Sequence, residues 1–314
     1  MRGHRSRNTL GLVLFAGIAA ATMVLTQTAA ASARYLVVQG LTGESQYQGL
    51  FDEQLHVIEE SARQQAADAD ITVLAGSDAT LANIRSAFAT LANGLTVSDS
   101  VQLILLGHGS YDGRQYKFNI AGPDLTDDEL QQMLDTLAPA PTLILAMTSS
   151  SGALQRKLAA DHRVIITATK SGLERNAPVF AQFWVRGLGN ADADTDKNSL
   201  LSARELFEYC SNRVEAHYRE QALLATEHAV LEGQNAAERF TVARVGVLAK
   251  ADLAPAVEGL IAQRTQLEDQ LRELRGARER MDEDAYLDQL EPLMLELGRL
   301  QREIDAQTLL DTPE

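Results

Sequence analysis

Two short apolar segments that end in turns of small residues constrain the fold of this chain most. Residues 101–106 (VQLILL) run into the turn GHGS at 107–110, and residues 142–147 (TLILAM) run into TSSSG at 148–152. Predominantly apolar runs of this length are typical of strands that are buried on both faces of a parallel sheet. Because the carboxyl ends of parallel strands meet at one edge of the sheet, we expect both turns at that edge.

Further apolar runs of strand length alternate with helical patterns. Thr126 and Glu129 form a capping-box pattern at the start of one expected helix. This order predicts an α/β fold with a mostly parallel sheet and helices on both faces. The additional expected strands are 35–39, 71–75 and 163–169, and the expected helices are 48–66, 79–92 and 126–137.

The start of the chain has the features of a targeting segment. The first seven residues carry three arginines, residues 10–25 are apolar and uncharged, and Ala31-Ser32-Ala33 offers a small-x-small cleavage site. The sequence therefore predicts a signal peptide over residues 1–33, with an uncleaved anchor as the alternative. We expect a periplasmic or secreted protein without a membrane span once the signal is cleaved.

Charge and cysteine content limit the possible partners and cross-links. Removal of residues 1–33 takes away three arginines and no acidic residue, so the formal net charge changes from −15 to −18. Such a chain repels phosphates, and we therefore expect no nucleic-acid partner. Cys210 is the only cysteine, which excludes an internal disulfide. On a helical segment (LFEYCSNRV) we expect this thiol to fill space in the core, as we expect of Trp184.

Residues 251–314 have a different pattern from residues 34–250. Apolar residues follow three-four spacing in two runs, which predicts a helical hairpin or coiled coil. Arg264 and Arg278 occupy the remaining positions of the first seam, and Pro292 is expected to kink or restart the second helix. The hairpin either packs on its own domain or serves as a partner-binding arm. The two apolar runs are Val257, Leu260, Leu267, Leu271, Leu274 and Met281, followed by Tyr286, Leu290, Leu293, Leu297, Leu300 and Ile304.

The ordered motifs of residues 34–249 resemble those of the caspase/legumain-like cysteine peptidases, most closely the bacterial branch. The resemblance rests on strand-GHGS, then strand-SSSG-helix, then RVIITAT at 163–169. It implies that His108 corresponds to the catalytic histidine and that Ser149 stands where the family has its nucleophilic cysteine. It also implies that the Gly109 and Ser149 amides correspond to the oxyanion hole. Residues 169–174 would correspond to the wall of the specificity pocket.

The serine changes the chemistry that this resemblance implies. A cysteine thiol ionises near pH 8.5, whereas a serine hydroxyl needs a well-aligned base that is oriented by a third group. The sequence shows no obvious orienting acid. We therefore predict a pseudopeptidase that acts by binding a protein or peptide, through its pocket or its C-terminal helices. The alternatives are an active endopeptidase with a Ser149–His108 dyad and a calcium-stabilised scaffold whose pocket has no role.

A loop later in the chain is close to an EF-hand pattern. Ser199 replaces the glycine of the usual turn, and Leu201 occupies the usual hydrophobic position. The loop is either a calcium site or an acidic, capped loop. His228, in a segment that resembles a late turn of the family, is expected to be structural. The expected calcium ligands are Asp194, Asp196, Asn198, Leu200 (through its carbonyl), Ser202 and Glu205.

Overall fold

The structure, a computed structural model, describes residues 32–66, 70–249 and 253–310. The predicted signal peptide therefore lies outside the described residues, except for Ser32 and Ala33. Ala33 is the first residue of strand β1 (Ala33–Gln39), and the Ser32 carbonyl accepts a hydrogen bond from the Ser100 amide at 2.9 Å. The first strand of the sheet therefore begins just before the expected cleavage site.

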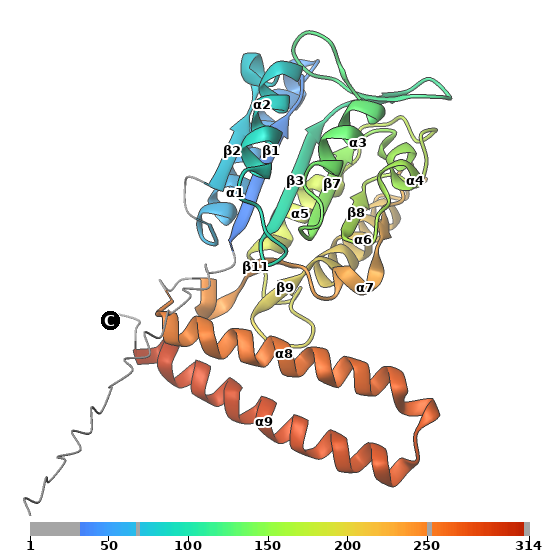
Figure 1. The fold of residues 1–314 in the computed structure, drawn as a ribbon. Coiled ribbons are helices and arrows are strands. Elements are labelled where there is room, and N and C mark those ends of the chain that lie inside the picture. Colours follow the sequence, from blue (N-terminus) through green and yellow to red (C-terminus); the bar gives the residue numbers. More distant parts are fainter. Residues whose placement is uncertain (1–31, 67–69, 250–252, 311–314) are drawn as a thin grey trace, which may run out of the picture. The chain divides into compact units, whose positions relative to one another are not determined.

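A six-stranded sheet in the order β10-β8-β7-β3-β1-β2 forms the centre of the fold (Figure 1). Five strands are parallel, and the edge strand β10 runs antiparallel to β8. The predicted mostly parallel sheet is confirmed. Its strands other than β1 are β2 (Ile71–Leu74), β3 (Ser100–Gly107), β7 (Thr142–Thr148), β8 (Arg163–Thr167) and β10 (Val230–Glu232).

Helices cover both faces of this sheet, because alternate strand residues are apolar on each side. In β3, Leu103 and Leu105 pack with α2 and α3, whereas Ile104 and Leu106 pack with α1, α5 and α6. In Figure 1, α3 lies in front of the sheet and α5 behind it. The helices are α1 (Ser45–Arg63), α2 (Leu81–Ala92), α3 (Asp127–Asp135), α4 (Gln155–Leu158), α5 (Phe180–Leu188), α6 (Ala203–Glu220) and α7 (Gln234–Ala237).

Local side-chain chemistry sets several of the helix ends. The helix expected over 48–66 begins earlier and ends earlier, as α1. Thr80 lies before α2 and accepts the Asn83 amide, so this helix starts after the expected residue 79. Thr126 and Glu129 form both hydrogen bonds of the predicted capping box at the start of α3.

Smaller elements complete the domain. A three-stranded sheet of β4 (Gly109–Tyr111), β5 (Tyr116–Phe118) and β6 (Leu125–Thr126) directly follows β3. A second small sheet pairs β9 (Leu200–Ser202) with β11 (Thr241–Arg244). Short 3-10 turns are η2 (Gly76–Asp78), η3 (Ser151–Leu154), η4 (Gly246–Ala249) and η5 (Arg278–Arg280).

The C-terminal segment is a helical hairpin, as predicted. Helices α8 (Pro255–Ala277) and α9 (Glu283–Leu310) pack against each other, and α9 continues through Pro292. The expected restart at this proline is therefore wrong. Arg264 lies in the seam with 2% of its surface exposed, and its Nη1 donates to Gln301 Oε1 at 2.6 Å.

The base of the hairpin packs on the α/β domain. Leu200 and Leu248 form an apolar cluster with Val257, Ile261 and Ile304 of the hairpin. At this end an ion pair joins Arg244 Nη2 to Glu258 Oε1 at 2.8 Å. Nearer the turn between α8 and α9, a second ion pair joins Arg272 Nε to Glu238 Oε2 at 3.1 Å. The base of the hairpin is therefore part of the domain core. Among the described residues, no helix has the length and apolar character needed to cross a membrane.

Removal of the hairpin is expected to destabilise the domain. Truncation before Leu253 uncovers Leu200 and Leu248, which are 8% and 2% exposed. The expected loss is about 2–5 kcal/mol of unfolding free energy, or roughly 5–15 °C in Tm. In the full chain, Ile304→Ala should lower Tm while Leu295→Ala should not, since these residues are 1% and 66% exposed. An unchanged Tm after truncation would contradict the packing described above.

Candidate functional site

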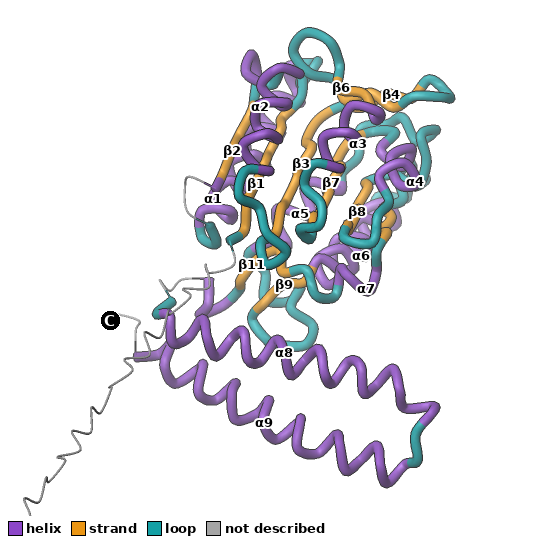
Figure 2. The backbone as a smooth tube through the Cα atoms, viewed as in Figure 1, coloured by secondary structure: helices purple, strands orange, loops and turns teal. Residues whose placement is uncertain are grey.

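The pairing of β3 with β7 brings the two predicted turns together. The strands are parallel and in register, with Gly107 opposite Thr148. His108 and Ser149 each follow one of these paired residues, and Figure 2 shows the two strands side by side. Paired residues of neighbouring strands lie about 5 Å apart. The structure therefore places His108 and Ser149 at the same edge of the sheet, as the sequence predicts.

The His108 imidazole is held in place by the segment that follows β1. Its Nε2 lies 3.1 Å from the Thr42 carbonyl oxygen, and the rings of Tyr47 and Phe51 lie 5.0 and 5.4 Å from the imidazole between centroids. A carbonyl oxygen only accepts hydrogen bonds, so Nε2 is assigned the proton and Nδ1 the lone pair. The orienting group is thus a backbone carbonyl. Because any residue carries one, no residue type along the chain could indicate it.

The Ser149 hydroxyl is bonded to the main chain of Gly109. Its Oγ donates to the Gly109 carbonyl at 3.0 Å and accepts from the Gly109 amide at 3.3 Å, and Ser149 is 4% exposed. Among the described residues, no hydrogen bond joins this hydroxyl to His108, whose Nε2 is bonded to Thr42. The Gly109 amide, which is expected to donate to an oxyanion, thus already donates to the Ser149 hydroxyl.

The turn after β3 leaves no room for a side chain at residue 109. A Cβ atom on Gly109 would lie 2.6 Å from the Ser149 carbonyl oxygen and closer still to Tyr116 Oη. Tyr116 is itself buried and its hydroxyl lies 2.6 Å from Thr148 Oγ1. Burial raises the pKa of the Tyr116 hydroxyl, so this phenol stays neutral. Glycine at 109 is therefore required by close packing of the two turns.

Residues 169–174 pack on the turn that carries Ser149. Thr169 Oγ1 accepts the Gly152 amide at 2.9 Å, and the Glu174 carbonyl accepts the Ser150 amide at 2.8 Å. The expected strand over 163–169 ends at residue 167, since Thr169 takes part in this turn. Leu173 in this segment is 73% exposed. The segment thus borders the site, where the resemblance predicts a pocket wall.

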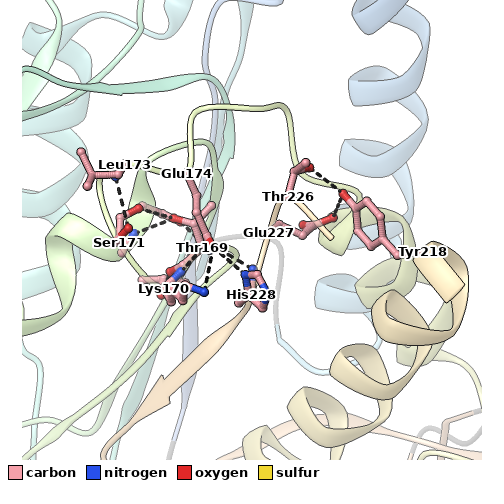
Figure 3. Close-up of polar contacts among 12 residues, drawn as sticks. Thr169, Lys170, Ser171, Leu173, Glu174, Tyr218, Thr226, Glu227 and His228 are labelled. Atoms are coloured by element: carbon pink, nitrogen blue, oxygen red, sulfur yellow. Dashed lines mark hydrogen bonds and ion pairs between the residues drawn. The ribbon is translucent and has the colours of Figure 1, made fainter. Parts of the chain in front are cut away.

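His228 has a partner that the sequence did not reveal. Its Nδ1 lies 2.5 Å from Glu174 Oε1, and its amide donates to Glu174 Oε2 at 3.2 Å (Figure 3). The two residues are 54 positions apart, so no local pattern could indicate the pair. The contacts of His228 with Glu174 thus join two segments of the domain, in keeping with the structural role expected for this histidine.

Glu227, next to His228, faces a different part of the domain. Its carboxylate accepts the amides of Val179 and Phe180, at 2.8 and 3.2 Å, at the start of α5. It also accepts the Tyr218 hydroxyl at 3.1 Å (Figure 3). Burial raises the pKa of this carboxyl. Glu227 therefore ties α5 to α6.

The acidic loop before α6 adopts a tight turn with converging carboxylates. Ligand atoms of Asp194, Asp196 and Glu205 lie within 4.8 Å of one another. Ser199 has φ +65°, the left-handed conformation that the expected glycine would supply, and Lys197 has φ +61°. The substitution of glycine by serine thus does not prevent the turn.

The remaining expected ligands lie around this turn. Leu200 begins β9, and Ser202 is the N-cap residue of α6 in a capping box with Glu205. Asn198 Nδ2 donates to Glu268 Oε1 of α8 at 3.4 Å. Burial, together with the neighbouring Glu205 carboxylate, raises the pKa of Asp196 to about 6. The loop therefore concentrates negative charge.

Two other residues occupy the positions that the sequence predicts. Trp184 of α5 and Cys210 of α6 belong to the same apolar cluster, with 1% and 0% of their surfaces exposed. Burial raises the pKa of the Cys210 thiol well above its ordinary value. A buried, protonated thiol is a poor nucleophile.

Comparisons with known proteins give structural likenesses only. No model of a known protein family matches this sequence, and neither does any curated protein. Protein GSU0716 from Geobacter sulfurreducens is 15% identical, with a TM-score of 0.45 over 64% of this chain and 92% of that one. The structure of drICE is 13% identical, with a TM-score of 0.41 over 64% and 87%. Caspase-1 from Spodoptera frugiperda is 13% identical, with a TM-score of 0.43 over 65% and 86%.

A side chain at residue 109 is expected to disrupt the site. Gly109→Ala forces its Cβ against the Ser149 carbonyl and should cost about 3 kcal/mol of unfolding free energy. Gly49→Ala is the matched control, because nothing lies within 4 Å of a Cβ at this position in α1. It should stabilise the protein by about 0.5–1 kcal/mol. Urea unfolding measures both, and equal effects would contradict the close packing at Gly109.

Proposed function

We propose that this protein is a periplasmic or secreted caspase-fold pseudopeptidase that acts by binding a protein or peptide. The order of the GHGS and SSSG motifs and their position on neighbouring parallel strands support the proposal. The charged and apolar features of residues 1–33 support export. The partner would bind at the edge of the sheet near His108 and Ser149, or at the C-terminal hairpin.

The hydrogen bonds of the Ser149 hydroxyl carry this proposal. Attack on a carbonyl requires that the hydroxyl give its proton to a base, but the Ser149 proton is directed at the Gly109 carbonyl. The same hydroxyl accepts the hydrogen bond of the Gly109 amide, which an oxyanion would need as a donor. In this arrangement the Ser149 hydroxyl thus has no base to take its proton, and the Gly109 amide is not free to bind an oxyanion.

An active hydrolase remains the second candidate because of one observation at His108. The Thr42 carbonyl fixes the ring with Nε2 protonated, which leaves the Nδ1 lone pair to act as a base. Activity would require that Ser149 exchange its bond to Gly109 for one to His108. This exchange sacrifices two hydrogen bonds of a buried hydroxyl.

A peptidase assay separates the two candidates. Mature wild-type protein and Ser149→Ala should both leave a broad peptide library uncut, with and without calcium. Ser149→Cys should gain cleavage at least about tenfold above background, because a thiol ionises far more readily than a hydroxyl. His108→Ala in the Ser149→Cys chain should abolish that gain. Cleavage by wild type that Ser149→Ala removes would overturn the pseudopeptidase proposal.

We also propose that the loop from Asp194 to Glu205 holds a calcium ion. Carboxylate, amide and main-chain oxygens are the ligands that calcium prefers, and the converging carboxylates and the left-handed Ser199 suit an EF-hand-like turn. The ion would be structural. It would neutralise the clustered carboxylates and fix the start of α6.

Calorimetry tests the calcium site. Wild type is expected to release or absorb heat on titration with Ca²⁺, and Asp194→Ala should abolish this heat. Asp192→Ala is the control, since this exposed acid is not among the three converging groups. It should leave the affinity within about twofold. No heat with wild type would remove calcium from the proposal.

A further inference from the structure

One residue, Glu174, joins three segments around the Ser149 turn. Its carbonyl accepts the Ser150 amide at 2.8 Å, directly after Ser149. Its carboxylate accepts the Lys170 amide at 2.9 Å, from the segment after β8. The same carboxylate binds the amide and Nδ1 of His228, from the segment before β10 (Figure 3).

The charge and shape of the Glu174 side chain fit this task. Only 13% of the side chain is exposed, and its two oxygens face two main-chain amides and one imidazole nitrogen. A carboxylate only accepts, so His228 Nδ1 is assigned the proton in this pair. A glutamine at 174 would turn its NH2 group either toward the two amides or toward Nδ1, and it would satisfy all three contacts only if the imidazole changed tautomer. The Lys170 ammonium also lies 3.6 Å from this carboxylate, and its side chain is 56% exposed.

The Ser150 turn depends on this support because its conformation is unusual. Ser150 has φ +59°, a left-handed conformation that costs a non-glycine residue free energy, and it is fully buried. Gly152 lies so close to the same segment that a Cβ there would be 2.6 Å from Ser171 Cα and closer still to the Ser171 amide nitrogen. Movement of residues 169–174 would therefore move the turn that carries Ser149.

We propose that Glu174 is a positioning residue: it holds the Ser149 turn, the pocket wall at 169–174 and the segment around His228 in one arrangement. The proposal rests on the proposed function in one respect, namely that the edge of the sheet near Ser149 is the binding site. His228 acts through Glu174. The shape of the site is thus set by a pair from two distant segments.

Glu227 provides a matched control because it is the same residue type, directly before His228. It is 3% exposed and also accepts main-chain amides, but at the start of α5. Substitution of either glutamate by glutamine should lower Tm. Only Glu174→Gln should alter the environment of residue 149.

Alkylation of a thiol placed at residue 149 measures this environment without a known substrate. In the full-length Ser149→Cys protein, the rate at which iodoacetamide modifies the introduced thiol is followed by mass spectrometry between pH 6 and 9. Buried Cys210 is the unreactive reference. Glu174→Gln should change the rate about threefold or more, since alkylation follows thiolate content and access. Glu227→Gln should leave the rate within about twofold, even at equal loss of Tm.

His228→Ala keeps the proposal testable if Glu174→Gln does not fold, because the His228 side chain is 47% exposed. It should change the alkylation rate of the introduced thiol in the same direction as Glu174→Gln does. The protein that carries both substitutions should differ little in this rate from the proteins that carry either one alone. Glu174→Asp, which retains the charge, should restore part of the parent rate. Rates in Glu174→Gln and His228→Ala equal to the parent would overturn the positioning role. Cleavage by the Ser149 wild type would instead overturn the proposed function and leave this result unaffected.

Discussion

The parallel pairing of β3 with β7 is the constraint on which the site depends. Each strand is buried on both faces, so a one-residue shift of register would exchange the side chains that pack in the two apolar cores. The register that satisfies both cores sets Gly107 opposite Thr148. The positions of His108 and Ser149 follow from the packing of the sheet. A chain with this fold would therefore keep the geometry of the site for as long as it keeps its core, whether or not the site catalyses a reaction.

The sequence predicts the parallel strands and the helices α1 to α3, because burial and capping are local signals. Apolar runs identify the five parallel strands, and Thr126 with Glu129 marks the start of α3. By contrast, the end of the strand at residue 167 depends on contacts of Thr169 with the Ser151–Gly152 turn, which no pattern along the chain contains.

The candidate site is less predictable, because its decisive contacts are made by main-chain atoms or by distant partners. The sequence indicates His108 and Ser149, but not the Thr42 carbonyl that orients the imidazole. Nor does it indicate that the Ser149 hydroxyl bonds to the main chain of Gly109. The pairing of Glu174 with His228 spans 54 positions and two different segments. The residue types thus indicate which side chains belong to the site, whereas the hydrogen bonds determine which of their atoms are available to bind or react.

The buried guanidinium of Arg264 has a consequence for how the two hairpin helices align. A seam of leucines alone tolerates several alignments of α9 along α8, since apolar contacts have little direction. Arg264 lies in that seam and donates to Gln301. If α9 slid by one turn, the charge would remain buried but lose this acceptor. This polar contact thus favours the observed alignment over others that the apolar residues alone would allow, as a polar residue can in a coiled coil.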